Sequence, residues 1–403
     1  MAGKQFTNLE KQRFRCNEAL CPRHGRPREV LLEPASLWSD HEVIVVSPIL
    51  KRVVYPWLAN SGYLRRRADG GGAFCALTYH GVLPAGYEVG DAQQDGSLVS
   101  AENLRSQLQL LKESYQIVSP DEVRDWITGG KELPERAVLL TCDDGLRNVL
   151  TDMAPILREE GVSCLFFVLG VSVAENPQML WYEQLYLLLQ AAPAGKYSLA
   201  GLEDGPEMSV ELTDGGQRRS AWWNLVKGLS QYDQSPRADF IESSRIQFGL
   251  PEQWNAEYTH GEAQRRRFGL LNRHDLRQLV DQGMSVGSHT LNHPMLSQQP
   301  SELAWREISE SRALLEDAIG KPIWAMAYPF GDSGSVTTRE MQMAEQAGFE
   351  CAFTNVAGGF GATLTRFALP RVHVTTDMSL AEFEAHLSGF HRDFRSRLSG
   401  ATP

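Results

Sequence analysis

Two histidines, His289 and His293, stand four positions apart in SVGSHTLNHP (285–294), and two adjacent aspartates, Asp143 and Asp144, follow the apolar run AVLLTC. Two imidazoles and one carboxylate form a recurrent ligand set for a divalent metal, which leaves coordination positions for water and substrate. A second carboxylate beside the first can accept a proton from metal-bound water, whose pKa the metal lowers to about 7. These residue types predict a hydrolytic metal site, provided that the fold brings both segments together.

The motifs share a position, because each follows an apolar stretch with the character of a β-strand. Asp143 follows AVLLTC, His289 follows MSVGS, and Pro329-Phe330-Gly331 follows PIWAMAY. Taken singly, Asp-Asp-Gly is usually a turn and a spaced histidine pair is usually a surface pair or a cap. In parallel α/β folds, however, the carboxyl ends of strands share the face where active sites are built. We therefore expect these segments to converge there, with Gly145 permitting the turn that aims the two aspartates differently.

Apolar strands alternate with amphipathic helices along most of the chain. Helices are expected to end at Gly161 and Gly320, and Ser335 is the expected N-cap of the last helix in this series. Strands that alternate with helices form parallel sheets, so the pattern predicts a parallel, barrel-like α/β fold. The predicted strands are 73–80, 137–141, 163–169, 284–289, 322–328 and 350–354.

Residues 175–270 break this alternation. The segment is too long for a compact connection between strands and helices, and it is predicted to be a largely helical insertion. We therefore divide the chain into an N-terminal extension, 1–70, and an α/β barrel, 71–403, interrupted by 175–270. Four aromatic residues of the insertion are expected mainly in its core, with stacking on sugar faces as the alternative: Trp181, Tyr182, Trp222 and Trp223.

The composition is that of an ordinary soluble globular protein, with 42% hydrophobic and 22% charged residues. The formal charge of −11 argues against nucleic acid as a partner, because phosphate binding requires concentrated Lys and Arg. The basic leading segment is expected to contact the acidic body. Cys16, Cys21 and His24 match no zinc pattern well and lack a fourth ligand. The oligomeric state is not indicated.

The beginning of the chain is polar and lacks the apolar core of a signal peptide. Its most apolar early stretch, 43–64, is interrupted by Lys51, Arg52 and two prolines, so no transmembrane span is predicted. We expect a cytoplasmic protein whose stretch 43–64 is amphipathic and packs on the body; the alternative is that it rests on a membrane surface.

Three motifs make a resemblance to a known family recognisable. "LLTCDDG", "SVGSHTLNHPMLS" and "AYPFGD" resemble the first three motifs of the NodB-homology polysaccharide deacetylases, carbohydrate esterase family four. The similarity covers about residues 73–175 and 270–375 and points to the intracellular or exopolysaccharide-linked branch. It implies a distorted (β/α) barrel and metal-dependent hydrolysis of an acetyl group, foremost N-acetyl, from a carbohydrate.

The resemblance also implies roles for single residues. It makes Asp143 the general base and Asp144, His289 and His293 the ligands of a divalent metal, Zn²⁺ first, with Co²⁺, Ni²⁺, Fe or Mn²⁺ as alternatives. A backbone N–H near Tyr328, Pro329 and Phe330 would hold the oxyanion. "LTYHGV" would place Tyr79 and His80 near the same face, with His80 supporting the site more readily than ligating the metal.

The sequence departs from the family pattern in three places. Cys142 stands where the first motif usually has Phe, and the motif that contributes Asp and Trp on the acid side is not recognisable. The third motif lacks the arginine that orients the base, so Arg371 in "LPRVHV" is the candidate for that role. His373 in the same stretch resembles the late-motif histidine that protonates the leaving amine, the alternative being a structural histidine.

Two other functions are weighed against carbohydrate deacetylation. The same scaffold could hydrolyse small or cyclic amides, but no sequence feature supports that substrate. The chain could also be a glycan-binding relic with a vestigial site, against which the retained Asp143 speaks, because binding alone needs no base. The expected substrate is an acetylated saccharide, such as a lipid-linked or nucleotide-linked precursor in polysaccharide biosynthesis.

Overall fold

The computed structural model describes residues 48–69, 74–89, 95–175, 177–200, 202 and 207–399, all within the compact unit Val45–Pro403. Residues 1–47 of the basic leading segment 1–70, with Cys16, Cys21 and His24, lie outside the described part. In its described part, Lys51, Arg65 and Arg67 pair with Glu382, Glu384 and Asp393 of the body, as expected for a basic segment that contacts the acidic body. No helix among the described residues combines the length and apolar character needed to cross a membrane.

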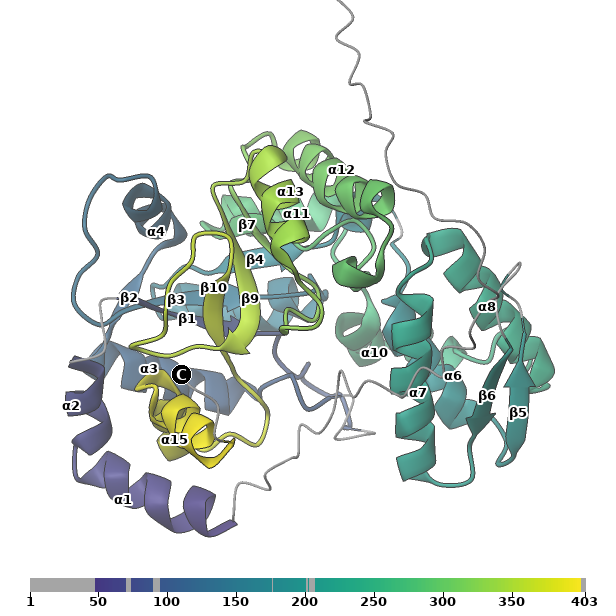
Figure 1. The fold of residues 1–403 in the computed structure, drawn as a ribbon, viewed down its shortest axis with the longest axis horizontal. Coiled ribbons are helices and arrows are strands. Elements are labelled where there is room, and N and C mark those ends of the chain that lie inside the picture. Colours follow the sequence, from purple (N-terminus) through teal and green to yellow (C-terminus); the bar gives the residue numbers. More distant parts are fainter. Residues whose placement is uncertain are drawn as a thin grey trace, which may run out of the picture. The chain divides into compact units, whose positions relative to one another are not determined.

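Seven parallel strands close into a barrel (Figure 1), which confirms the predicted fold class. Their order is β1-β10-β9-β8-β7-β4-β3, and the ring closes where β1 pairs with β3 from Phe74 opposite Ala137 to Tyr79 opposite Cys142. The short strand β2 (Gln116–Val118) pairs with the first half of β3. The barrel strands are β1 (Phe74–Tyr79), β3 (Ala137–Cys142), β4 (Leu165–Val168), β7 (Ser285–Ser288), β8 (Ala325–Ala327), β9 (Cys351–Ala357) and β10 (Leu369–His373).

Side chains of each strand alternate between the interior of the barrel and the surrounding helices. The interior holds small residues and aromatic rings, among them Ala76, Phe167 and Phe353. The alternate positions, such as Leu77 of β1 and Val138 of β3, belong to the larger core that the strands share with the helices. Both faces are therefore buried, as in other parallel sheets covered by helices.

The covering helices begin and end where the sequence supplies caps. Gly320 adopts a left-handed conformation, with φ of 67°, and ends α12 as predicted. Ser335 is not the N-cap of α13; Thr337 is, in a capping box with Glu340, because the Ser335 amide is held in a turn by Asp332. These helices are α3 (Ala101–Ser114), α4 (Pro120–Ile127), η2 (Val149–Met153) with α5 (Ala154–Glu159), α11 (Arg273–Asp281), α12 (Ser301–Ile319), α13 (Thr338–Gln346) and α14 (Leu380–Leu387).

Between β4 and β7 the chain forms a mainly helical region with an apolar cluster of its own. It also contains one antiparallel hairpin that the sequence did not predict. The buried guanidinium of Arg267 pairs with Asp95 in the loop after β1 and with Glu183 in α6. The elements are η3 (Gly170–Val173), α6 (Trp181–Ala191), β5 (Lys196–Leu199), β6 (Met208–Glu211), α7 (Gly215–Leu229), α8 (Gln234–Gln247), α9 (Ala256–His260) and α10 (Glu262–Phe268).

The described part of the early apolar stretch is helical. It forms η1 (Leu50–Val54) and α1 (Tyr55–Asn60), followed by α2 (Tyr63–Asp69), which pack with α14 and α15 (Phe390–Ser399) at the end of the chain. The Tyr55 hydroxyl lies 2.7 Å from Nδ1 of His391 in α15. One face of this segment thus packs on the body, one of the two arrangements expected for it.

Candidate active site

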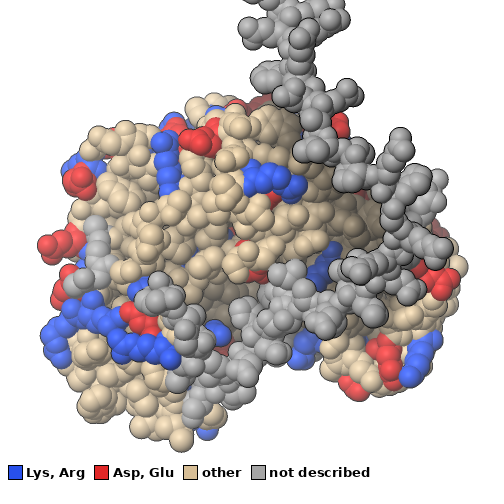
Figure 2. All heavy atoms as spheres, in the orientation of Figure 1, with Lys and Arg blue, Asp and Glu red and all other residues tan. Residues whose placement is uncertain are grey.

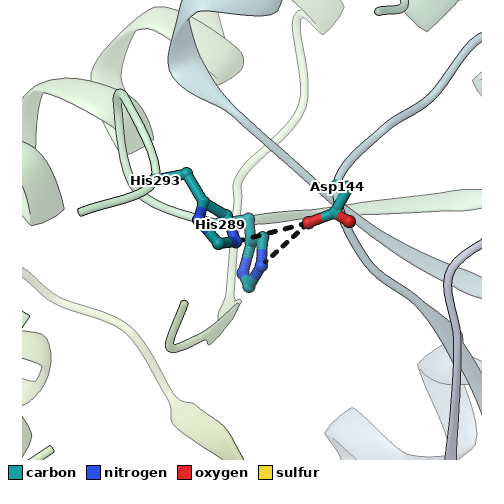
Figure 3. Close-up of side chains that lie close together, drawn as sticks. All are labelled: Asp144, His289 and His293. Atoms are coloured by element: carbon teal, nitrogen blue, oxygen red, sulfur yellow. Dashed lines mark ion pairs between the residues drawn. The ribbon is translucent and has the colours of Figure 1, made fainter. Parts of the chain in front are cut away.

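Asp144, His289 and His293 converge at the carboxyl ends of the barrel strands (Figure 3). Asp144 follows β3, and the loop that leaves β7 carries both histidines. Oδ1 of Asp144 lies 3.5 Å from Nε2 of His289 and 3.4 Å from Nε2 of His293. All three side chains are buried, and their ligand atoms lie within 4.8 Å of one another. The structure therefore brings together the three predicted ligands.

Strained backbone is concentrated at this site. Among the described residues other than glycine, five have positive φ, and four of them surround the site: Asp144 (72°), Thr290 (67°), His293 (55°) and Phe330 (61°). Such conformations persist only where the surroundings over-determine them, and they cluster at functional sites. Gly145 also has φ of 70°, and a Cβ there would lie 2.8 Å from Val168, so the predicted need for glycine at this turn is confirmed.

The orientation of the His289 ring is fixed by a hydrogen bond at Nδ1, the ring nitrogen that does not face Asp144. Its Nδ1 lies 2.8 Å from the carbonyl oxygen of Ala327 in β8. Donation of the Nδ1 proton to this carbonyl leaves the Nε2 lone pair facing Asp144, an arrangement usual for metal-binding histidines. The carboxylates of Asp143 and Asp144 outweigh burial and raise the pKa of His289, whereas burial lowers the pKa of His293.

The loop with His293 is fixed by Glu307 of α12. The buried carboxylate of Glu307 accepts hydrogen bonds from the backbone amides of Leu291 and Asn292 and from the Asn292 side chain, at 2.8–2.9 Å. Burial raises the pKa of Glu307, although these donors oppose the shift. The indole of Trp181 donates to the carbonyl of His293 over 3.1 Å. Both sides of the loop are therefore held by neighbouring helices.

The three side chains fit a divalent cation. Oδ1 of Asp144 is buried yet makes no hydrogen bond to a described residue, which is costly unless another group satisfies it. Donors about 2.1 Å from a tetrahedral zinc ion are about 3.4 Å apart, as the oxygen and each imidazole nitrogen are here. Burial alone would raise the pKa of Asp144, but His289 and His293 hold it well below its usual value, so the carboxylate is ionised.

The Asp143 carboxylate pairs with Arg371 and is not one of the three grouped metal-ligand residues. The Arg371 guanidinium donates from Nη1 to Oδ1 and from Nη2 to Oδ2 of Asp143, both at 2.7 Å, and both side chains are buried. Burial would raise the pKa of Asp143, but the charge of Arg371 outweighs it and lowers that pKa. Arg371, the residue expected to orient the base, therefore contacts the Asp143 carboxylate directly from β10.

The side chain of Tyr79 does not reach the site, contrary to expectation, and the side chain of Tyr328, of which only a nearby backbone N–H was expected, also points away from it. The Tyr79 hydroxyl donates to Gln107 of α3, and the Tyr328 hydroxyl donates to the carbonyl of Phe367, both at 3.0 Å. Tyr79 ends β1 and Tyr328 directly follows β8, and both side chains belong to the core that the strands share with the helices.

Of the three residues expected to supply an oxyanion donor, only Phe330 has an available amide. The amide of Tyr328 already donates to the carbonyl of Phe353 over 3.0 Å, and Pro329 has no N–H. The amide of Phe330 makes no hydrogen bond to any described residue. The Phe330 ring also lies 5.0 Å from the His293 ring, between centroids.

His80 and His373 lie beside each other at the ends of β1 and β10. Their ring centroids are 5.0 Å apart, in an edge-to-face arrangement, and the His80 ring is not part of the metal-ligand group. His373 is exposed to solvent. The surrounding protein atoms and the neighbouring His80 nevertheless lower the pKa of His373, so its imidazole is neutral in the free protein at neutral pH.

The sequence did not reveal the position of Tyr182. Its hydroxyl donates to Oδ2 of Asp144 over 3.2 Å, and its ring centroid lies 4.8 Å from that of His293. Burial and the charge of Asp144 raise the pKa of Tyr182, so its hydroxyl keeps its proton. All four aromatic residues of the insertion pack against the apolar cluster of the α6–α8 region, as mainly expected, and the Trp222 indole donates to the carbonyl of Tyr182. Of the four aromatic residues, Trp181 and Tyr182 therefore border the site.

Comparison with known proteins is consistent with this geometry. A family model described as polysaccharide deacetylase matches residues 130–184 and 206–352, half of the chain. The poly-beta-1,6-N-acetyl-D-glucosamine N-deacetylase of Escherichia coli is 41% identical over 86 residues, which are 21% of this chain and only 12% of that protein.

Two solved structures are similar over most of the chain. IcaB from Ammonifex degensii has a TM-score of 0.48 and 18% identity, and the match covers 79% of this chain and 98% of that one. The deacetylase PplD of Streptococcus pyogenes, solved with acetate, has a TM-score of 0.47 and 16% identity, covering 79% and 99%.

Proposed function

The chain belongs to the polysaccharide deacetylase family, and we propose that it removes an N-acetyl group from a carbohydrate in a metal-dependent hydrolysis. The observation that carries this proposal is the position of Asp143. Its carboxylate is fixed by Arg371, directly precedes the ligand Asp144 in the chain, and is close enough to His289 for its charge to raise the pKa of that imidazole. A base and a metal-ligand set in adjacent positions are what the hydrolysis of an unactivated amide requires.

Asp144, His289 and His293 would hold the metal, with Zn²⁺ as our first choice because it prefers imidazole and carboxylate ligands. Co²⁺, Ni²⁺, Fe and Mn²⁺ are the alternatives. When bound, such a cation would polarise the carbonyl of the acetyl group and lower the pKa of a water molecule. Tyr182 would orient the carboxylate of Asp144 by donating to the oxygen that faces away from the imidazoles.

The protein's own groups would then move the protons. Asp143 would accept a proton from the attacking water, since each of its oxygens keeps a second lone pair beside the one used by Arg371. The amide of Phe330 would donate to the developing oxyanion. His373 would deliver a proton to the departing amine nitrogen, which cannot leave as an anion near neutral pH.

We propose an acetylated saccharide as the substrate, and the name of the Escherichia coli relative makes poly-N-acetylglucosamine the first compound to test. Trp181, half-buried beside the histidine loop, would be the first aromatic residue to test for contact with a sugar ring. Small cyclic amides have no supporting observation. The satisfied Asp143–Arg371 pair speaks against a binding relic, because binding requires no oriented base. A cytoplasmic precursor as the natural substrate stays a prediction from the sequence.

The test is acetate release by the purified chain, stripped with a chelator and reloaded with single metals. N-acetylglucosamine oligomers with β-1,4 and β-1,6 linkages and a set of cyclic amides serve as substrates. We expect acetate from at least one oligomer, no activity in the stripped protein, and restoration by Zn²⁺ or Co²⁺. Hydrolysis of cyclic amides alone, or no acetate with any metal, would contradict the proposal.

A further inference from the structure

The outer face of the helical segment formed by η1 and α1 exposes large apolar side chains. Val53 is 59% and Trp57 67% exposed, and Ile49 one turn earlier is 66% exposed. Residues four positions apart lie on the same side of a helix, so these side chains form a continuous apolar stripe. Tyr63 at the start of α2 is a fourth exposed large apolar side chain and, after Trp57, the second ring.

The opposite face of the same segment is already buried. Leu50, Tyr55 and Leu58 pack with Ala385 of α14 and with phenylalanines of α15. A helix that is apolar on both sides normally has neighbours on both sides. Ten large apolar side chains are exposed in the described part of the protein, and four of them lie within the fifteen residues 49–63. The stripe is therefore a local concentration that packing within the described residues does not explain.

The segments that carry and flank the stripe are basic on an otherwise acidic protein. Residues 48–69 and 377–399 together hold eight Lys and Arg against five Asp and Glu, whereas the whole chain has a net charge of −11. Figure 2 shows basic side chains gathered at the lower left, where Figure 1 places α2 and α15. Arg52 and Arg66 are exposed and form no ion pair with a described acidic residue.

We propose that this face, defined by Val53, Trp57, Arg52 and Arg66, binds the surface of an anionic lipid bilayer. Exposed tryptophan and aliphatic side chains beside arginines suit the boundary between lipid headgroups and acyl chains. Arginines attract anionic headgroups, and this attraction is sensitive to salt. The sequence immediately before the described helix, VIVV at 43–46, is also apolar.

Two other occupants of the face are less suited to it. A second copy of the chain would bring the same basic surface into contact with itself, and like charges at an interface are repelled. Residues 1–47 hold seven Lys and Arg against six Asp and Glu, so they lack the negative charge that would complement the face. A bilayer with anionic headgroups supplies both the apolar and the negative component.

The test is flotation of the full chain with phosphatidylcholine vesicles, with and without added phosphatidylglycerol. We expect binding to the anionic vesicles that falls with rising salt, and weak binding to the neutral ones. Val53→Ser with Trp57→Ser should weaken binding about tenfold or more, and Arg52→Gln with Arg66→Gln should remove its dependence on phosphatidylglycerol. Trp305→Ser is the matched control, because Trp305 is 39% exposed on α12, away from this face.

Circular dichroism checks that each variant is folded, and all the changed side chains are exposed. Equal binding by the Val53/Trp57 variant and the protein itself, or no binding to anionic vesicles at low salt, would overturn the proposal. A dimer that dissociates on the Val53/Trp57 change, without vesicle binding, would assign the face to a second copy. Binding only after removal of residues 1–47 would assign it to that segment. Both results would also overturn it.

Discussion

The guanidinium of Arg371 makes two parallel hydrogen bonds to Asp143, which lies 228 residues earlier in the chain. Its other N–H groups donate to the Thr354 carbonyl, the Thr141 hydroxyl and the Asn355 side chain. All five donors of this arginine are thereby used. The carboxylate that we propose as the base is therefore fixed in orientation and in its charged state by the last strand of the barrel.

Arg371→Ala is expected to destabilise the protein by about 3–5 kcal/mol, because it leaves the Asp143 carboxylate buried without its partner. It should also raise the pKa of Asp143, so that activity declines at a higher pH as the solution is acidified. Urea unfolding and a pH–rate profile measure the two effects. Arg273→Ala removes an exposed pair with Asp317 and serves as control, with an expected cost below about 1 kcal/mol.

The same pair predicts how stability depends on pH. The folded pKa of Asp143 lies below its usual value, so its contribution to stability is fully present above pH ~4, the unfolded value. That contribution is lost as the pH falls through the lowered folded pKa. In Arg371→Ala the folded pKa of Asp143 is no longer held below the unfolded value, so this variant should lose less stability than the unchanged protein between pH ~4 and lower pH. An equal acid loss in both proteins would contradict our account of the pair.

Asp143 and Asp144 are adjacent but should respond differently to substitution. Asp143→Asn is expected to lower acetate release by about 10²–10⁴-fold while the metal is retained, because the base is removed and the ligands are kept. Asp144→Asn should lose metal, because it replaces an anionic ligand by a neutral amide. Metal analysis of both purified variants beside the acetate assay separates the two roles. Loss of metal in Asp143→Asn would contradict them.

The sequence predicted which segments meet, because a motif after an apolar strand of a parallel barrel must lie at one end of that barrel. It did not predict which way Tyr79 and Tyr328 point. All six residues of β1 are buried, and so is Tyr328 after β8, so no alternation of polar and apolar residues marks the inner face. Family patterns led to Arg371 as the partner of Asp143, whereas its further hydrogen bonds to Thr141, Thr354 and Asn355 required the strand order.

The contacts of Tyr182 and Glu307 with the site could not be predicted from the sequence, for a different reason. Each acts on the site from a helix whose position is set by packing, α6 and α12, and neither belongs to a motif. The aromatic pair at the start of α6 was visible, but a tyrosine near the start of a helix is most often part of a core. Only the placement of α6 beside the barrel makes its hydroxyl a partner of Asp144.

Tyr182→Phe is expected to weaken metal binding about tenfold, since partners that orient a ligand contribute about 10–100-fold to affinity. The change removes the hydroxyl bound to Asp144 and keeps the ring that packs on His293. Metal affinity is measured by competition with a chromogenic chelator. Tyr197→Phe is the matched control, because its hydroxyl donates to the Pro193 carbonyl in the same region. Equal affinities in both variants would exclude a role for Tyr182 in holding the ligand.

Metal affinity should fall as the solution is acidified, and the pKa of His289 sets the pH at which this fall begins. Metal binding requires the neutral imidazole, and the neighbouring carboxylates raise the pKa of His289 above its usual ~6.5. Affinity is therefore expected to decline about tenfold per pH unit below that raised value. Asp143→Asn removes one of the charges that raise this pKa, so the decline should begin at a lower pH. Chelator competition at a series of pH values tests both statements.

His373 can be tested as the acid by changing the leaving group. An amine must be protonated to depart, whereas the phenolate of an aryl acetate leaves without a proton. His373→Asn should therefore lower the hydrolysis of an N-acetyl sugar by about 10²-fold or more and that of 4-nitrophenyl acetate by much less.

The pKa of His373 is lowered, so it readily gives up a proton but is neutral in the free protein. It would have to gain that proton after substrate binds, and Asp143, once it has accepted a proton from water, would be the source. Equal losses on both substrates would show that His373 acts in binding or structure rather than as the acid.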